Sequence, residues 1–432
     1  MLETIKNAWR VADIRKKILF TFLILLVFRL GARIPVPFVD PAALQAATTM
    51  EGGVNEFFNY LSILTGGGLE YGAIFAMSVT PYINASIIIQ LLCVAIPYLE
   101  RLSKEGEEGS KKLAQITRYA TVVLALIQGI VYYFYLKNSG YLTSFATKSG
   151  VFATIFAAVV IVLCFTAGSA LVMWLGERID VHGIGNGISI LLFAGIISRG
   201  PDAFLVLWNY AVELKRYVAV AGIVIGFLAV IAFIVWMTNA ERRIPVQYAK
   251  RVVGNKMYGG QNSHIPIKVN MSGVMPVIFA SSILMVPTMI LSFMRNTTSS
   301  WYKFLSLFST TGVFYAVLYF FLIIGFAYFY TTIQFNPVEM TNNLRKNGGS
   351  IPGIRPGKPT SDFITKILSR ITLMGALFLS LIAILPIIIG NISNIPISLG
   401  GTSVLILVGV ALDTVQNLES QMMMRHYKGF LD

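Results

Sequence analysis

The residues that most often carry chemistry are few in this chain, and their spacing matches no common catalytic site. Its three histidines fall in separate polar segments and lack the paired spacing of zinc ligands: His182, His264 and His426. The glycine-rich run at 183–187 lacks the Gly-x-x-x-x-Gly-Lys-Ser/Thr spacing of a phosphate loop. Cys93 and Cys164 lie in apolar stretches, where a free thiol packs as a small hydrophobe. We therefore expect no metal, no cofactor, no ATP hydrolysis and no enzymatic activity.

Three ionisable residues stand in or beside apolar segments: Arg29, Glu70 and Asp413. A charge within a membrane is costly and often marks an ion pathway. No series of carboxylates or histidines accompanies these three, so a proton relay is not indicated. We expect each charge to pair at a helix end or to extend its head group to the membrane interface.

Composition places the chain among membrane proteins. Of its 432 residues, 56% are apolar and 12% are charged, which is far from the balance of a soluble domain. Most of its ten apolar runs are long enough to cross the hydrocarbon core, which takes about 20 helical residues. The fifth run is short and begins with glycines. The predicted spans are 18–34, 73–96, 117–136, 151–175, 184–199, 217–237, 271–292, 312–333, 367–389 and 403–420.

Basic residues are distributed unevenly between the connecting segments. If the N-terminus is cytoplasmic, most of the 34 Lys and Arg residues fall in cytoplasmic segments, which then carry most of the net charge of +14. Lys and Arg in short loops resist translocation. The pattern predicts ten spans with both termini in the cytoplasm.

A short sequence occurs almost twice. VTPYINAS at 79–86 and VMPVIFAS at 274–281 share five of eight positions and lie about half a chain apart. Related halves are common in membrane transport, with the pathway at their interface. Chance similarity between apolar helices is the alternative.

The segment 55–68 is too short to cross the membrane, and it ends in three glycines. It fits a re-entrant half-helix that turns back at the glycines, which is tolerated only inside protein or in a water-filled cavity. An interfacial helix on the outer surface fits equally well.

Two basic loops predicted on the cytoplasmic side are longer than a simple connection needs. Alternating apolar residues in 238–270 predict a hairpin, and prolines and glycines in 343–360 predict a stiff, sharply turned tip. Basic loops also fix topology or contact anionic lipid. Their length favours docking of a partner, for which RNA phosphates are one candidate.

Several ordered motifs resemble the bacterial SecY family of protein-conducting channels, and the resemblance extends over the whole chain. The motifs are RLGARIPVPFVD at 29–40, IFAMSVTPYINASIIIQLL at 74–92, GERIDVHGIGNGISILLFAGI at 176–196, ERRIPVQYAKR at 241–251, FNPVEMTNNLRKNGGSIPGIRPGKPT at 335–360 and GGTSVLILVGVALD at 400–413.

The resemblance implies an all-α polytopic membrane protein in the cytoplasmic (inner) membrane, with ten transmembrane helices in two inverted five-helix halves. The halves would be residues 1–215, with the first five spans, and 216–432, with the last five. They would enclose a pore that passes unfolded secretory polypeptides and releases transmembrane segments sideways into lipid. An aliphatic waist would block ions without binding a sliding chain.

The resemblance also assigns roles to residues. The pore ring would be Val79, Ile83, Ile188, Leu192, Ile278 and Ile406. The plug, a re-entrant helix within 55–68, would include Phe57, Phe58, Leu61, Ile63, Leu64, Gly66, Gly67 and Gly68. The lateral gate, formed by spans two and seven with help from three and eight, would contain Gln90, Ser281 and Ser282.

Partners would supply the driving force. Contacts with the SecA motor ATPase and with the rRNA of the ribosome would be made by Arg242, Arg243, Lys250, Arg251 and Arg355. SecE and SecG would flank the channel, and signal sequences and nascent chains would be its substrates.

Two other classes share parts of this pattern. An inverted-repeat solute transporter would have the same spans but polar ligands at broken helices. An intramembrane enzyme would need nucleophile or histidine motifs within the spans, and the sequence has none there.

Overall fold

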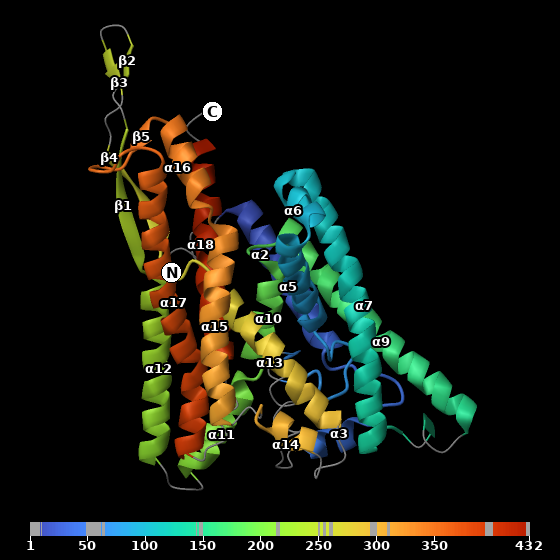
Figure 1. Ribbon diagram of the computed structural model, residues 1–432. Helices are drawn as coiled ribbons and strands as arrows, with labels where there is room; N and C mark the ends of the chain where they lie inside the picture. The colour runs from blue at the N-terminus through green and yellow to red at the C-terminus, as the bar shows by residue number, and fades with distance from the viewer. Residues whose placement is uncertain are drawn as a thin grey trace. The chain divides into compact units, whose positions relative to one another are not determined.

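The computed structural model describes residues 9, 11–48, 62, 65–143, 145–146, 150–212, 217–248, 251–253, 256–258, 262–293, 300–308, 312–393 and 401–428. The chain divides into two compact units, and Figure 1 labels the helices and strands that they contain. Unit 1 comprises residues 1–221, 285–310 and 394–432, and unit 2 comprises 222–284 and 311–393. The halves implied by the family resemblance, 1–215 and 216–432, are not defined by such contacts, and they stay a prediction.

Each of the ten predicted spans coincides with a helix. The helices are α2 (Ala12–Gly31), α5 (Thr80–Ala95), α7 (Glu107–Ser139), α9 (Val151–His182), α10 (Gly187–Ile197), α12 (Tyr217–Asn239), α13 (Met275–Phe293), α15 (Val313–Gln334), α17 (Lys358–Ser393) and α18 (Gly401–Lys428). Shorter helices lie between them: α3 (Pro41–Thr48), α6 (Pro97–Lys104), α11 (Gly200–Val212), α14 (Ser300–Ser306) and α16 (Pro337–Lys346).

Among the described residues, seven helical segments are long and apolar enough to cross a membrane, or eight if α5 and α6 form one span bent by 103°. Helix α2 is apolar in its middle but carries basic residues at both ends. The prediction of a multi-pass helical membrane protein is confirmed. Ten transmembrane helices are consistent with these segments, but the exact number is not established.

Some helices extend well beyond their predicted spans. Helix α7 has 33 residues, about 50 Å at 1.5 Å per residue, against a hydrocarbon core of about 30 Å. The apolar run at 117–136 marks only its membrane part. Its polar first turns continue as helix, with an ion pair of 2.8 Å between Lys111 and Glu107.

Small residues recur on buried faces of α7 and α9, two helices of unit 1 that pack against each other. On α7 they recur every fourth residue, so they share one face: Thr117, Thr121, Ala125 and Gly129, of which Ala125 is fully buried. On α9, Ala153 and Ala157 have the same spacing and are buried as well. Small side chains let membrane helices approach closely, where packing rather than water exclusion drives association.

Large apolar side chains are exposed on the outer faces of the long helices. Phe152 on α9 is 84% exposed, and Val218 on α12 is 88% exposed. In a soluble protein such surfaces would cause association. In a bilayer they face hydrocarbon, which agrees with the membrane class.

The predicted hairpin is present in unit 2. Strand β1 (Glu241–Tyr248) pairs antiparallel with β4 (Asn262–Lys268), with Ile244 opposite Ile265. Between them, β2 (Arg251–Val253) pairs with β3 (Lys256–Tyr258). Figure 1 shows this small ribbon at the far end of the hairpin from α12. The alternation is partly confirmed, because Ile244 and Val246 are buried while Tyr248 is 37% exposed.

The second basic loop joins the first in one sheet, a pairing that is not visible in either loop's own sequence. Strand β5 (Gly349–Ser350) pairs with Gln247 and Tyr248 of β1, so the strand order is β4-β1-β5. A compact apolar core lies under this sheet, formed by Ile244, Ile267, Ile351, Ile364 and Leu368. The two loops and the start of α17 therefore form one folded surface.

Candidate functional site

Five of the six predicted ring residues lie in unit 1. Val79 precedes α5 and is 1% exposed, and Ile83 lies one turn further along that helix. The other three, on helices α10 and α18 that pack against each other, are all buried: Ile188, Leu192 and Ile406. Ile278, half-buried on α13, belongs to unit 2.

The glycine-rich run at 183–187 sets the start of α10. The Asn186 side chain accepts a hydrogen bond from the Ser189 amide at 3.0 Å and so caps the helix. Asp180 accepts one from the Gly187 amide at 2.7 Å. A Cβ at Gly187 would lie 2.0 Å from the Gly176 carbonyl oxygen, so only glycine lets α10 come this close to α9. The run is a tight helix start that positions Ile188.

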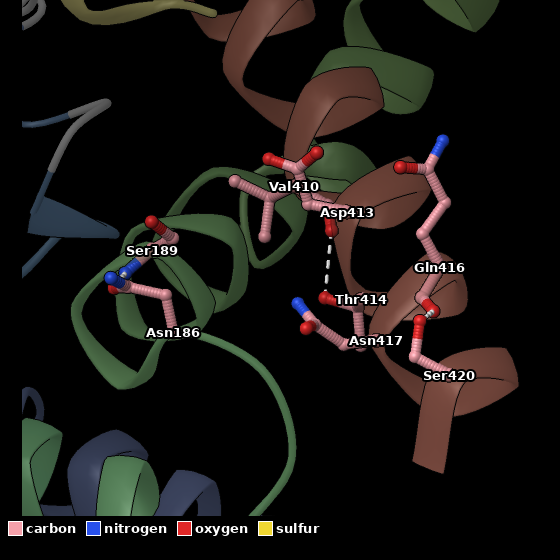
Figure 2. Close-up of a pocket in the computed structure, with 8 residues that line it drawn as sticks. All are labelled: Asn186, Ser189, Val410, Asp413, Thr414, Gln416, Asn417 and Ser420. Atoms are coloured by element: carbon pink, nitrogen blue, oxygen red, sulfur yellow. Dashed lines mark hydrogen bonds between the residues drawn. The ribbon is translucent and has the colours of Figure 1, made fainter. Parts of the chain in front are cut away.

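A polar pocket of about 280 Å³ lies between the start of α10 and α18 (Figure 2). Its lining consists mainly of hydroxyl, carboxamide and carboxylate groups: Asn186, Ser189, Val410, Asp413, Thr414, Gln416, Asn417 and Ser420. The Thr414 hydroxyl donates to the Val410 backbone carbonyl at 2.7 Å, and the Ser420 hydroxyl donates to the Gln416 backbone carbonyl at 2.9 Å. These groups can exchange hydrogen bonds with water or with a peptide backbone.

The plug prediction falls partly outside the described residues. Phe57, Phe58, Leu61, Ile63 and Leu64 lie outside them. The described part includes Ser62, Thr65 and the turn at Gly66, Gly67 and Gly68.

The glycine turn needs glycine for two separate reasons. Gly66 and Gly67 have φ values of +67° and +85°, which L-residues rarely adopt. A Cβ at Gly66 would also lie 2.9 Å from the Gly195 Cα on α10, whereas a Cβ at Gly67 would meet nothing within 4 Å. Gly66 therefore sets the distance of this turn from α10.

Arg29 contacts the same turn. Its Nη1 donates to the Gly66 carbonyl at 2.9 Å, and the Ser198 hydroxyl approaches that oxygen at 3.4 Å. Of the two expectations for Arg29, pairing at a helix end or extension of its head group to the membrane interface, the structure agrees with pairing, with a backbone carbonyl as the partner. It also pairs Glu70 with Arg199 at 2.6 Å. Arg199 was not singled out from the sequence, because nothing in its local pattern distinguishes it from other basic residues at span ends.

The predicted gate residues occupy two helices. Gln90 is half-buried on α5 in unit 1, and Ser281 and Ser282 are half-buried on α13 in unit 2. The Ser281 hydroxyl donates to the Ile278 carbonyl one turn back, at 2.9 Å. Its lone pairs can still accept a hydrogen bond.

The predicted partner-binding residues lie on the sheet and its adjoining turn. Arg242 and Arg243 are exposed on β1, where Arg243 forms an ion pair with Glu241 at 2.6 Å. Arg355 is exposed in the turn before α17, and its carbonyl accepts a hydrogen bond from the Thr360 hydroxyl at 2.8 Å. Arg251 lies in β2, and Lys250 lies outside the described residues.

Within the described ranges, no three His, Cys, Asp or Glu side chains gather in a way that could hold a metal ion. The fold and these residues define a multi-pass α-helical membrane protein whose two extramembrane basic loops share one sheet.

Comparison with known proteins identifies the family. The SecY family model matches residues 73–415, and the chain belongs to this family. The protein translocase subunit SecY of Bacillus subtilis is 47% identical over 443 residues, and that of Streptomyces coelicolor is 44% identical over 440 residues. Each of these matches covers 100% of both chains.

Solved structures share the fold at lower identity. A structure described as a protein-conducting channel matches with a TM-score of 0.61 and 16% identity, covering 94% of this chain and 92% of the other. The channel in an idle yeast Ssh1 complex bound to the 80S ribosome matches with a TM-score of 0.62 and 15% identity, covering 95% and 89%. A third structure, from work on how the SecY plug domain stabilises the closed channel and maintains a membrane seal, has a TM-score of 0.62 at 17% identity, covering 94% and 92%.

Proposed function

We propose that this chain is the central protein-conducting channel subunit of a bacterial Sec translocon. The observation that carries this proposal is the full-length similarity to protein translocase subunits SecY, at 44% to 47% identity with no part of either chain left over. Family membership favours the channel over a solute transporter.

The proposed path is a ring of aliphatic side chains. Val79, Ile83, Ile188, Leu192, Ile278 and Ile406 would form the waist, which supports an ion barrier because narrow apolar walls expel water. Such walls offer no directional bonds, so polypeptides of any sequence can pass. The polar pocket between α10 and α18 lies at the start of the helix that carries Ile188 and Leu192, and its hydroxyl and carboxamide groups can bind water.

The proposed plug is the segment 55–68, with its glycine turn as the hinge. The positive φ values of Gly66 and Gly67 support a turn at this place. The proposed lateral gate contains Gln90, Ser281 and Ser282. Hydrogen bonds between membrane helices contribute about 1 kcal/mol each, so a gate held by a few of them can open. A transmembrane segment could then leave sideways into lipid.

The proposed docking face is the β4-β1-β5 sheet with its adjoining turn. We assign Arg242, Arg243, Lys250, Arg251 and Arg355 to contacts with the SecA motor ATPase and with the rRNA of the ribosome. The exposed guanidinium groups of Arg242, Arg243 and Arg355, on a sheet with its own apolar core, support this assignment, because arginine forms paired hydrogen bonds with carboxylates and phosphates. In this arrangement SecE and SecG flank the channel, and both termini are cytoplasmic.

Reconstituted transport tests the function. The purified chain is placed in lipid vesicles with SecE and SecG, and SecA, ATP and a precursor protein with a signal sequence are added. We expect the precursor to become resistant to external protease, and the same precursor without its signal sequence to stay sensitive. Flux of a small solute without any protection of the precursor would overturn the proposal.

A further inference from the structure

A closed polar cluster surrounds Arg199 at the end of α10 in unit 1. Its Nη1 lies 2.6 Å from Glu70 Oε1 and donates to the Ser62 hydroxyl at 2.7 Å. The Ser62 hydroxyl in turn donates to Glu70 Oε1 at 2.7 Å. All three contacts are short, so each of the three side chains contacts both of the others.

The cluster is largely removed from water. The side chains of Arg199 and Glu70 are 19% and 18% exposed, and Ser62 is fully buried. A charge pair in such a place interacts more strongly than at an exposed site, and removing one partner leaves the other desolvated and unpaired. The pair is therefore a contact whose loss has a measurable cost.

The position of the cluster along the chain gives it a specific consequence. Ser62 precedes the glycine turn at 66–68 and Glu70 follows it, so Arg199 contacts both sides of that turn. The part that follows the turn is also held by α7, because the Tyr132 hydroxyl donates to the Leu69 carbonyl at 3.2 Å. If the turn opens, Ser62 must leave both Arg199 and Glu70.

We propose that Arg199 and Glu70 are positioning residues that close the glycine turn and so determine how readily the plug leaves the pore. This proposal rests on the proposed function of 55–68 as the plug. Because opening must break the contacts of Ser62 with this ion pair, the pair sets the free energy of opening, and with it the signal-sequence strength that the channel requires.

Ion leak through the resting channel reports how readily the plug leaves the pore. The complex is placed in planar lipid bilayers without SecA or precursor, and conductance is recorded for Arg199→Gln and Glu70→Gln. We expect each substitution to raise the resting conductance about tenfold, since hydrogen bonds to charged groups in partly buried sites are worth about that factor or more. The double variant Glu70→Arg with Arg199→Glu restores an ion pair, and its conductance should return near the wild-type value.

Two neighbouring residues serve as matched controls. Arg33 is exposed and stacks on Tyr71, with its guanidinium carbon 4.4 Å from the ring centre, and Asp202 is exposed at the start of α11. Arg33→Gln and Asp202→Asn remove the same charges from the same region and leave the contacts between Arg199, Glu70 and Ser62 in place. Both residues act electrostatically on Arg29, so they also test whether a change of charge near the turn is enough to open it. We expect both to keep the wild-type conductance.

A variant lacking residues 55–61 tests the plug assignment separately from the role of the Arg199–Glu70 pair. If this deletion raises the conductance while Arg199→Gln and Glu70→Gln do not, the plug assignment stands and the role of the pair is wrong. If the deletion leaves the conductance unchanged, the plug assignment fails and the role of the pair fails with it. If the variant with both Glu70→Arg and Arg199→Glu leaks as much as the single variants, the ion pair does not determine the resting conductance.

Transport of a normal precursor distinguishes positioning from general damage. Because Arg199 and Glu70 act on the closed state, both glutamine variants should transport a precursor with an intact signal sequence at the wild-type rate. They should also transport one with a weakened signal sequence several-fold faster than wild type. Loss of transport of both precursors would show a structural defect and overturn the positioning role.

Discussion

Arginine stands in two different environments in two regions of this chain. In unit 1, Arg199 is less than one-fifth exposed and its partners belong to the same chain. In unit 2, Arg242 and Arg355 are exposed on a sheet and on its adjoining turn. The desolvation cost of a buried guanidinium must be offset by partners within the fold. An exposed guanidinium is stabilised little by a neighbouring charge, and it stays available to bind an anionic partner. The comparison supports the two proposals above, in which the first region holds the glycine turn and the second binds partners.

The two regions also differ in what holds their backbone. The glycine turn of unit 1 depends on close backbone approach, with Gly66 against Gly195. The sheet of unit 2 stands on a core of branched aliphatic side chains, such as Ile351 and Ile364. Single backbone or charge changes should therefore disturb the first region, while the second should tolerate surface changes without unfolding.

The largest effect is expected at Gly66. Gly66→Ala places a methyl group against the α10 backbone at a positive φ, and we expect it to cost about 2–4 kcal/mol of local stability. Gly67→Ala has the same backbone strain in open space and should cost about 1 kcal/mol. Hydrogen exchange of the backbone at 65–70 measures both. Equal loss of protection in the two variants would show that the approach to Gly195 does not matter.

An intermediate effect is expected at the exposed tip. Arg355→Glu reverses a charge on the proposed docking face, and we expect SecA-driven translocation to fall about tenfold, which corresponds to about 1.4 kcal/mol. The thermal unfolding of the purified complex should stay unchanged, because the side chain is exposed. Arg345→Glu makes the same charge change on α16 and should reduce transport less. Wild-type transport by the Arg355→Glu variant would remove this residue from the docking face.

The smallest effect is expected at a more exposed ion pair of unit 1. Arg118 and Glu177 lie 2.6 Å apart, but their side chains are 48% and 25% exposed. We expect Arg118→Gln to lower the free energy of unfolding by less than about 1 kcal/mol and to leave the resting conductance unchanged. A leak comparable to that of Arg199→Gln would mean that any charge loss in unit 1 opens the channel, and that the location of Arg199 is not special.

Local patterns predicted the elements well. Apolar runs identified the ten helices, and the alternation around Ile244 and Val246 identified the hairpin, because each depends on neighbouring residues. The lengths of α7 and α9 were underestimated, since hydropathy marks where a helix is apolar and not where its hydrogen bonds end. Polar first turns, stabilised by pairs such as Lys111 with Glu107, are not visible in an apolar run.

Contacts between distant residues could not be predicted in the same way. The pairing of Gly349 with Tyr248 joins two loops that were treated separately, and the ion pair of Arg199 with Glu70 joins the end of one span to the segment before another. Each of these residues is unremarkable among its sequence neighbours. The ring residues were assigned through the family resemblance alone, because Ile188 or Leu192 would otherwise be interpreted as ordinary helix packing.

Disulfide crosslinking at Ile278 tests the central claim most directly. Cys93 and Cys164 are replaced, Ile278 becomes cysteine, and a secretory chain with one cysteine is arrested during transport in membranes that contain SecE and SecA. Efficient crosslinking that needs ATP and a functional signal sequence is the expected result, because the waist would surround the moving chain. Intact secretion without a crosslink at this position would show that Ile278 only packs in its helix, and would contradict a path through the aliphatic ring.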